Sequence, residues 1–146
     1  MADFKRPESV LVVIYTGHEE VLRLRRKDPL DFWQSVTGSL KWGETVLDAA
    51  KREVQEETGL DAGKGLIDSG DVNRYPIHPT WRAKFAPDVT ENTEHVFSLR
   101  LPAITAIRLD PNEHKEYRWL PRSQAVELAS SRTDRYAILK LVPEKL

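Results

Sequence analysis

The strongest structural signal in the chain is the stretch GSLKWGETVLDAAKREVQEETGL, from Gly38 to Leu60. Thr45 and Asp48 have the form of a capping box, in which a hydroxyl accepts an N-terminal amide and a carboxylate faces the positive end of the helix. Gly59 can adopt the left-handed conformation that ends a helix. The pattern therefore predicts one helix from Thr45 to Thr58.

The apolar residues of this helix predict which side packs on the core. At about 100° per residue, Leu47, Ala50 and Val54 fall on one stripe, and we expect them to face the interior. Glu53 and Glu57 lie toward the edge of this stripe, where the loss of water makes an ionised carboxylate more costly.

Glu53, Glu56 and Glu57 crowd one side of the helix at the spacing i, i+3, i+4. Like charges at this spacing repel each other by a few tenths of a kcal/mol per pair, so something should compensate them. A hard divalent cation such as Mg²⁺ fits, because it takes carboxylate oxygens and keeps waters and substrate phosphates as further ligands. The alternative is a solvated acidic face whose charge repulsion is reduced by Lys51 and Arg52.

The spacing of the whole stretch resembles the Nudix box of the Nudix hydrolases. Gly38 is followed after five residues by Glu44, and after seven more by the run Arg52–Leu60, REVQEETGL. About nine constrained positions are matched within 23 residues. The resemblance implies an α/β/α sandwich with a central mixed β-sheet. It also implies Mg²⁺-dependent hydrolysis of a diphosphate linked to another group.

The composition agrees with such an enzyme and argues against several other classes. The length of 146 residues predicts a single domain, residues 1–146, with a real core. The 23 acidic and 22 basic residues nearly cancel, so no overall basic field indicates a nucleic acid polymer as partner. Cysteine is absent, which excludes disulfides and zinc–thiolate sites. The longest apolar run near the N-terminus, Val10 to Tyr15, is six residues, so we expect no signal peptide, no membrane partner and a cytoplasmic location.

Hydrophobic patterns predict the remaining elements. Ser9–Thr16 is an unbroken apolar segment, typical of a strand buried on both faces. The next strand, Val21–Arg26, alternates, so that Arg23 and Arg25 lie on the face opposite the leucines, where either could be solvated. Further strands are expected at Phe32–Gly38, Leu66–Tyr75 (an edge strand), Glu94–Leu101, Ile104–Leu109 and Glu116–Leu120, and a helix begins at Pro121–Arg122, with helical spacing from Val126 to Leu141.

The segment Pro76–Thr93 contains three prolines and is expected to be a loop. Long ordered loops in compact domains are often functional. Its aromatic residues Trp81 and Phe85 could stack on a planar ring of a ligand or pin the loop to the core, and both interpretations stay open.

Residues outside the box carry a closer resemblance. The segments concerned are Lys5-Arg6-Pro7, Asp31–Gly38 (DFWQSVTG), Asn92-Thr93-Glu94 and Glu113-His114. They are similar to segments of the dihydroneopterin triphosphate pyrophosphatases, a bacterial branch of the Nudix family that also acts on dATP and related nucleotides. The similarity extends from Lys5 to about Ser131.

This second resemblance implies roles for individual residues. The metal ligands it implies are Glu53, Glu57 and Glu113, with Glu56 as a further candidate. The implied substrate contacts are Lys5, Arg25, Thr37, Tyr75, Pro76, Ile77, His78 and Ser131. Pro76 and His78 depart from the pattern of this branch, so a preference for pterins over nucleotides stays open.

The chemistry of diphosphate hydrolysis indicates what these residues must do. Water must reach a charged phosphorus, and the charge on the departing pyrophosphate must be spread. Glu113 is the first candidate to orient or deprotonate the water because it lies in a polar turn, and Glu53 and Glu56 stay open. Arg52 is expected to orient the glutamates by hydrogen bonds.

Residues and resemblance together predict an Mg²⁺-dependent pyrophosphohydrolase, with Mn²⁺ as a substitute metal. Its substrate is expected to be a small-molecule triphosphate, dihydroneopterin triphosphate or a (deoxy)nucleoside triphosphate, cleaved to a monophosphate and pyrophosphate. One alternative is a Nudix hydrolase of another nucleoside diphosphate-linked substrate. A second is a non-hydrolysing nucleotide-binding module, a class that lacks one or more of the glutamates retained here at Glu53, Glu56 and Glu57. The oligomeric state stays open.

Overall fold

The computed structural model describes residues 3–63 and 65–144, and within them seven strands form one mixed sheet. The strands are β1 (Glu8–Thr16), β2 (Glu20–Arg26), β3 (Trp33–Gln34), β4 (Val36–Ser39), β5 (Leu66–Pro76), β6 (Glu91–Leu101) and β7 (His114–Pro121). The order across the sheet is β3-β2-β1-β6-β5, while β4 pairs with β1 and β7 with β2. The β1–β6 pair is parallel and the others are antiparallel, so the predicted mixed sheet is confirmed.

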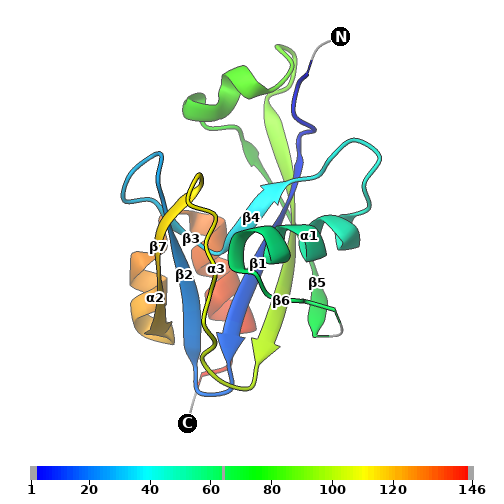
Figure 1. Ribbon diagram of the computed structural model, residues 1–146. Coiled ribbons are helices and arrows are strands. Elements are labelled where there is room, and N and C mark those ends of the chain that lie inside the picture. The colour runs from blue at the N-terminus through cyan, green and yellow to red at the C-terminus, as the bar shows by residue number, and fades with distance from the viewer. Residues whose placement is uncertain (1–2, 64, 145–146) are drawn as a thin grey trace.

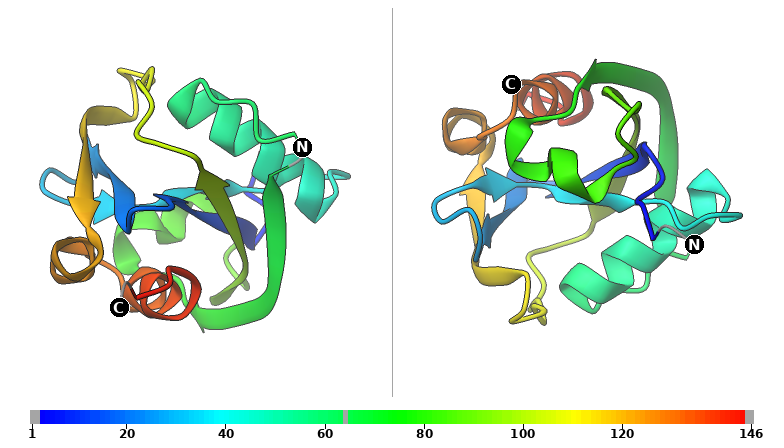
Figure 2. Two further views of the ribbon diagram at one scale, coloured as in Figure 1. Left: turned by 90° about the horizontal axis from the view of Figure 1, so that it is seen from below. Right: turned by 90° about the horizontal axis from the view of Figure 1, so that it is seen from above.

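Helices cover both faces of this sheet (Figure 1). They are α1 (Val46–Thr58), α2 (Arg122–Leu128) and α3 (Arg132–Leu141), and a 3-10 helix, η1, spans Pro79–Lys84. Viewed from either end, α1 lies on one side of the sheet and α2 with α3 on the other (Figure 2). The α/β/α sandwich is therefore confirmed. None of the helices in the described residues is long and apolar enough to cross a membrane.

β1 explains why the core has two parts. Its Val10, Val12 and Ile14 pack with α1, whereas Leu11 and Val13 pack with α2 and α3. Alternate side chains of a strand point to opposite faces, so a strand between two helical layers needs apolar residues at every position. The expected burial of this strand on both faces is confirmed.

The helix α1 has the predicted ends but a different buried side. Thr45 caps it by accepting a hydrogen bond from the Asp48 amide at 3.1 Å, and Gly59 ends it with a φ of 76°. The buried stripe is rotated toward the side of Glu53 and Glu57. Leu47 therefore lies at the edge of the interface and is 46% exposed, so its predicted burial was wrong.

Tertiary contacts change three of the predicted elements. The strand expected at Phe32–Gly38 is split into β3 and β4, and the one expected from Glu94 begins at Glu91 as β6. The helical spacing over Val126–Leu141 is divided between α2 and α3. The division occurs where the Ser131 hydroxyl caps α3 by accepting a hydrogen bond from the Asp134 amide at 3.1 Å.

The strand expected at Ile104–Leu109 is not formed. The Arg108 amide donates to the Thr58 carbonyl at the end of α1, and the Trp119 indole donates to the Thr105 carbonyl. These backbone groups find partners outside a strand ladder, while Ile107 is buried in the core beside α1. The apolar pattern therefore indicates the burial of Ile107 correctly, but the strand that it predicts is not formed.

Candidate functional site

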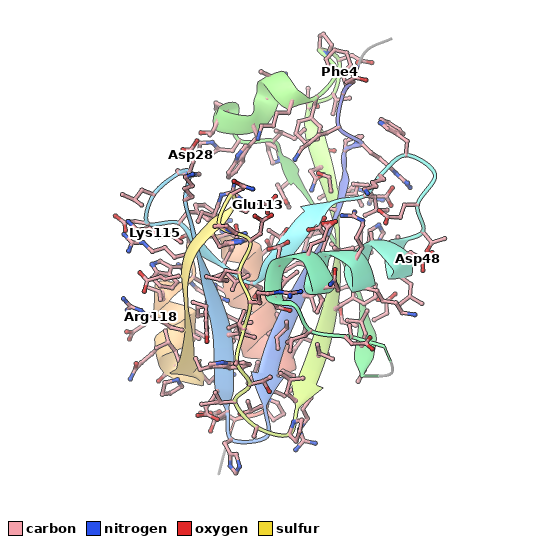
Figure 3. All side chains as sticks on the ribbon, in the orientation of Figure 1. Phe4, Asp28, Asp48, Glu113, Lys115 and Arg118 are labelled. Atoms are coloured by element: carbon pink, nitrogen blue, oxygen red, sulfur yellow. The ribbon has the colours of Figure 1, made fainter. Side chains whose placement is uncertain are left out.

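A pocket of about 1090 Å³ opens at the end of the sheet from which β1 starts. Its lining comes from the N-terminal arm, the β2–β3 hairpin, β4, α1, η1, β6, the turn before β7 and the start of α3. The labelled Phe4, Asp28 and Glu113 all belong to the lining and mark the upper part of the molecule in Figure 3. Segments far apart in the sequence thus converge on one cavity.

Two glutamates of α1 are buried beside this pocket. Glu53 is 8% exposed and Glu57 only 1%. Burial raises the pKa of the Glu57 carboxyl well above its ordinary value, and hydrogen bonding and repulsion from Glu53, with repulsion from Glu113, raise it further. Among the described residues, neither Glu57 oxygen has a hydrogen-bond partner of ordinary geometry. A buried carboxylate without donors needs a cation or a proton.

Glu113 approaches Glu57 from a different part of the chain. It lies on the turn before β7, and in Figure 3 its side chain points toward the space between that turn and β4. The Asp110 carbonyl holds the turn by accepting the Glu113 and His114 amides at 3.0 and 2.9 Å. Desolvation raises the pKa of Glu113, and repulsion from Glu53 adds to the effect.

His114 is a functional candidate for which sequence reasoning assigned no role. Ligand atoms of Glu57, Glu113 and His114 all lie within 4.8 Å of one another. Burial lowers the His114 pKa to about 4, so its ring is neutral at pH 7 and can offer a lone pair. Gln34 Nε2 lies 3.0 Å from His114 Nε2. The sequence signals for His114 were its position directly after Glu113 and its place in a segment that carries the family resemblance.

Gly38, the first residue of the box, makes room for these carboxylates. A Cβ atom at this position would overlap the carboxyl group of Glu53. Any residue other than glycine would therefore displace Glu53 from the pocket wall. This close approach, rather than a special backbone angle, explains the glycine.

Arg52 holds the glutamates around it in place. Its guanidinium donates to both Glu44 oxygens at 2.8 Å, to Glu53 Oε1 at 2.6 Å and to Glu56 Oε2 at 3.1 Å. A further hydrogen bond to the Ser39 carbonyl at 3.1 Å ties the helix to β4. Hydrogen bonds from Arg52 lower the Glu44 pKa to about 2. The exposed Glu56 thus faces Arg52, whereas Glu57 faces Glu113 and His114.

The structure brings some of the predicted substrate contacts to the pocket. Lys5, Thr37, Tyr75 and Ser131 belong to its lining. Two of them also make internal bonds, since the Thr37 hydroxyl donates to the Val10 carbonyl and the Ser131 hydroxyl caps α3.

Other predicted contacts lie outside the described lining. They are Pro76, Ile77, His78 and Arg25. Ile77 is buried, and His78 caps η1 by accepting a hydrogen bond from the Thr80 amide at 3.1 Å. His78 also packs against Trp81, which does line the pocket.

Arg25 is engaged away from the pocket, and its neighbour Arg26 enters it. The Arg25 guanidinium forms ion pairs with Asp31 and Glu116. A β-bulge between Arg25 and Arg26 shifts the register against β7, and Arg26 lies over the ring of Trp81. Because bulges re-aim side chains, period-2 alternation could not identify Arg26 as a pocket residue.

Positive charge gathers near the glutamates. Arg26, Lys5 and Lys84 all line the pocket. Desolvation and the neighbouring Lys84 lower the pKa of Lys5, whereas Glu113 and Glu53 act in the opposite direction. The cations and the glutamates are therefore close enough to influence one another, which suits a polyanionic ligand together with a divalent cation.

The residues present fit a hard divalent cation. Glu57 supplies two buried oxygens that lack hydrogen-bond donors in the described part of the chain, and Glu113 reaches the same place from another element. Such a carboxylate-rich donor set suits Mg²⁺ or Mn²⁺. The acidic cluster is thus built into the wall of the pocket and is not a solvated helix face.

Comparison with known proteins agrees with this geometry. The NUDIX domain model matches residues 5–142. The chain is 44% identical over 143 residues to dihydroneopterin triphosphate diphosphatase of Escherichia coli (strain K12), covering 95% of this chain and 94% of that protein. It is 38% identical over 144 residues to the protein of the same name from Haemophilus influenzae, covering 96% and 90%.

A solved structure extends the comparison to the fold. The E. coli dihydroneopterin triphosphate pyrophosphohydrolase matches with a TM-score of 0.90 and 43% identity, over 97% of this chain and 98% of that chain. Sequence and fold agree over nearly the whole length. The chain therefore belongs to the NUDIX domain family and is a Nudix hydrolase.

Proposed function

We propose that this Nudix hydrolase converts dihydroneopterin triphosphate, or a (deoxy)nucleoside triphosphate, to a monophosphate and pyrophosphate. The proposal is supported mainly by one observation: buried glutamates and cationic side chains lie together at one pocket. The relatives named above support the substrate class, because they are dihydroneopterin triphosphate diphosphatases. The substrate is proposed to be a small molecule, and the expected cytoplasmic location stays a prediction.

Glu53, Glu57 and Glu113 would hold a divalent cation, Mg²⁺ with Mn²⁺ as a substitute, and Glu56 stays a further candidate. When bound, such a cation neutralises phosphate charge and polarises the diphosphate. Arg52 fixes the orientation of Glu53 through its 2.6 Å hydrogen bond. The pre-set carboxylate then needs no reorganisation when the substrate arrives.

Lys5 and Arg26 would bind the triphosphate tail, because both line the pocket and lie near enough to Glu113 to act on its pKa. Charge-assisted hydrogen bonds from arginine to phosphate are strong and often bidentate. The role expected for Arg25 stays a prediction, and it requires this side chain to leave Asp31 and Glu116. Thr37 and Ser131 remain proposed contacts along the wall.

Glu113 is the first candidate to position and deprotonate the attacking water. It lies on an exposed turn at the pocket mouth, where water and substrate both have access. Glu53 and Glu56 remain alternatives for this role, and both accept a hydrogen bond from Arg52.

The proposal is tested by incubating the protein with Mg²⁺ and a panel of triphosphates that includes dihydroneopterin triphosphate and dATP. Pyrophosphate and orthophosphate are measured separately, without inorganic pyrophosphatase. We expect pyrophosphate equal to turnover, activity with Mn²⁺ in place of Mg²⁺, and none with EDTA. Early orthophosphate equal to turnover would show that a different bond breaks, and failure to hydrolyse any member would contradict the proposal.

A further inference from the structure

Glu94 is a buried carboxyl group in the pocket wall, on the face of the sheet opposite the metal-binding glutamates. It lies on β6 and is only 4% exposed. Its Oε1 accepts from Asn73 Nδ2 at 3.2 Å and its Oε2 from the Tyr75 hydroxyl at 3.3 Å, both long for bonds to a carboxylate. The Thr133 side chain of α3 also forms a hydrogen bond with it. An ionised carboxylate has about four lone-pair sites, so three donors leave part of the acceptor capacity of Glu94 unused.

Asn92 provides a second unused acceptor beside it. Two residues earlier on β6, it points to the same face and is 6% exposed. Its Nδ2 donates to the Ser9 hydroxyl at 2.8 Å and to the Tyr75 hydroxyl at 3.1 Å. The single Tyr75 proton is directed at Glu94, so Tyr75 must accept from Asn92, which fixes the amide orientation. Asn92 Oδ1 then has no partner within residues 3–63 and 65–144.

These acceptors and the acidic cluster of α1 line opposite parts of one pocket. Glu53 projects from α1, which packs on one face of the sheet, whereas Glu94 faces α3 on the other face. Trp81 and Phe32, whose rings meet edge to face, contribute aromatic surface to the same lining. A ligand with its phosphates near Glu53 would place its other end near Glu94.

We propose that Glu94 and Asn92 form the ring-binding part of the pocket and select the 2-amino-4-oxo edge that pterin shares with guanine. This edge presents a ring N–H and an exocyclic amine side by side, two donors that match a carboxylate in bidentate fashion. Asn92 Oδ1 accepts a further N–H. Adenine presents an acceptor beside its amine, so it offers one donor fewer to a carboxylate.

The inference deepens the proposed function and rests on it. A pocket built to hydrogen-bond a donor rejects an analogue that lacks the donor, because the buried acceptor is left unpaired. Burial raises the pKa of Glu94 in the free protein, which is the cost that a donor pair on the ligand would offset.

The test compares dGTP with dITP, which differ only in the exocyclic 2-amino group. We expect the unmodified protein to favour dGTP in kcat/KM by about 10-fold or more. In Glu94→Gln the ratio should fall toward one, because the new amide donor faces the amine of the substrate. In this variant, kcat/KM for dihydroneopterin triphosphate should fall together with kcat/KM for dGTP. Glu91→Gln, an exposed position at the start of the same strand, is the matched control and should keep the original ratio.

The ratio within one preparation is independent of how much protein is folded, and the dGTP/dITP comparison on the unmodified protein needs no variant. Equal kcat/KM for the two substrates in the unmodified protein, or an unchanged ratio in Glu94→Gln, would contradict the ring-binding role of Glu94 and Asn92. Either result would leave the proposed function intact. If the unmodified protein hydrolyses no triphosphate with Mg²⁺, the proposed function fails and this inference fails with it.

Discussion

At the scale of single residues, Glu57 shows most directly what this pocket is built to hold. Its carboxyl group is buried, close to Glu53 and Glu113, and neither of its oxygens has a hydrogen-bond partner of ordinary geometry among the described residues. Without a cation this arrangement is costly, since desolvation and repulsion both act against the charged form. A bound divalent cation would offset the cost of this buried negative charge.

Glu57→Gln should therefore abolish hydrolysis without unfolding the protein. We expect turnover at saturating Mg²⁺ to fall by more than the roughly 10- to 100-fold that loss of a supporting residue costs a metal site. In EDTA the variant should melt at the same temperature as the unmodified protein or higher, because a buried charge has been removed. Added Mg²⁺ should raise the melting temperature of the unmodified protein only.

Glu127→Gln on α2 is the matched control, since Glu127 is exposed and outside the pocket lining. Near-normal turnover in folded Glu57→Gln, or an undiminished Mg²⁺ shift in its melting curve, would remove Glu57 from the metal site.

At the scale of elements, the loop before α1 is attached to the helix by a charged pair. Glu44 accepts two hydrogen bonds from Arg52 and one from the Lys41 amide at 2.9 Å. The box pattern requires both residues, and the structure gives the physical reason. The pair closes the loop and at the same time aims Arg52 at Glu53.

The stability that this pair contributes should depend on pH. The Glu44 pKa is about 2 in the folded protein, against an ordinary value of 4.5, so the unfolded chain takes up the proton first as the pH falls. The contribution is complete above the ordinary pKa and is lost as the pH falls toward about 2. Glu44→Gln should lower the free energy of unfolding by about 1 to 2 kcal/mol at neutral pH.

The difference in unfolding free energy between the unmodified protein and Glu44→Gln, from denaturant titrations at several pH values, should narrow on acidification. Glu127→Gln again serves as control. A difference that stays constant down to the lowest accessible pH would contradict the assignment of this carboxylate as a stabilising partner of Arg52.

At the scale of the whole molecule, a buried ion pair joins the sheet to α3. Arg23 of β2 is fully buried and donates to Asp134 Oδ2 at 2.5 Å. Asp134 also accepts from the Ser35 amide at 2.9 Å and the Ser35 hydroxyl at 2.7 Å. The alternative that Arg23 is solvated, open from its strand pattern, is wrong because α3 covers that face of the sheet.

Asp134→Asn should destabilise the protein strongly, because it leaves the Arg23 charge buried without a counter-charge. Breaking a buried pair in this way costs about 3 to 5 kcal/mol. The matched control is Asp71→Asn, which removes the exposed ion pair between Asp71 and Lys140 of α3 and should cost less than about 1 kcal/mol. Equal losses in urea unfolding of the two variants would contradict a special role for the buried pair.

The sequence by itself determined the parts of this protein that depend on neighbours along the chain. The capped helix α1, the apolar strand β1 and the spacing that places Glu53 and Glu57 on one side of a helix all follow from periodicity and local hydrogen bonds. The expectation that residues 1–146 form a single domain stays a prediction.

Only the tertiary structure decided which distant residues meet. It placed Glu113 and His114 against Glu57, turned Arg26 instead of Arg25 into the pocket through a bulge, and brought Glu94 to its wall. It also exposed Leu47 by the way α1 lies on the sheet. These outcomes depend on packing between elements, and local periodicity carries no information about the partner that each face will find.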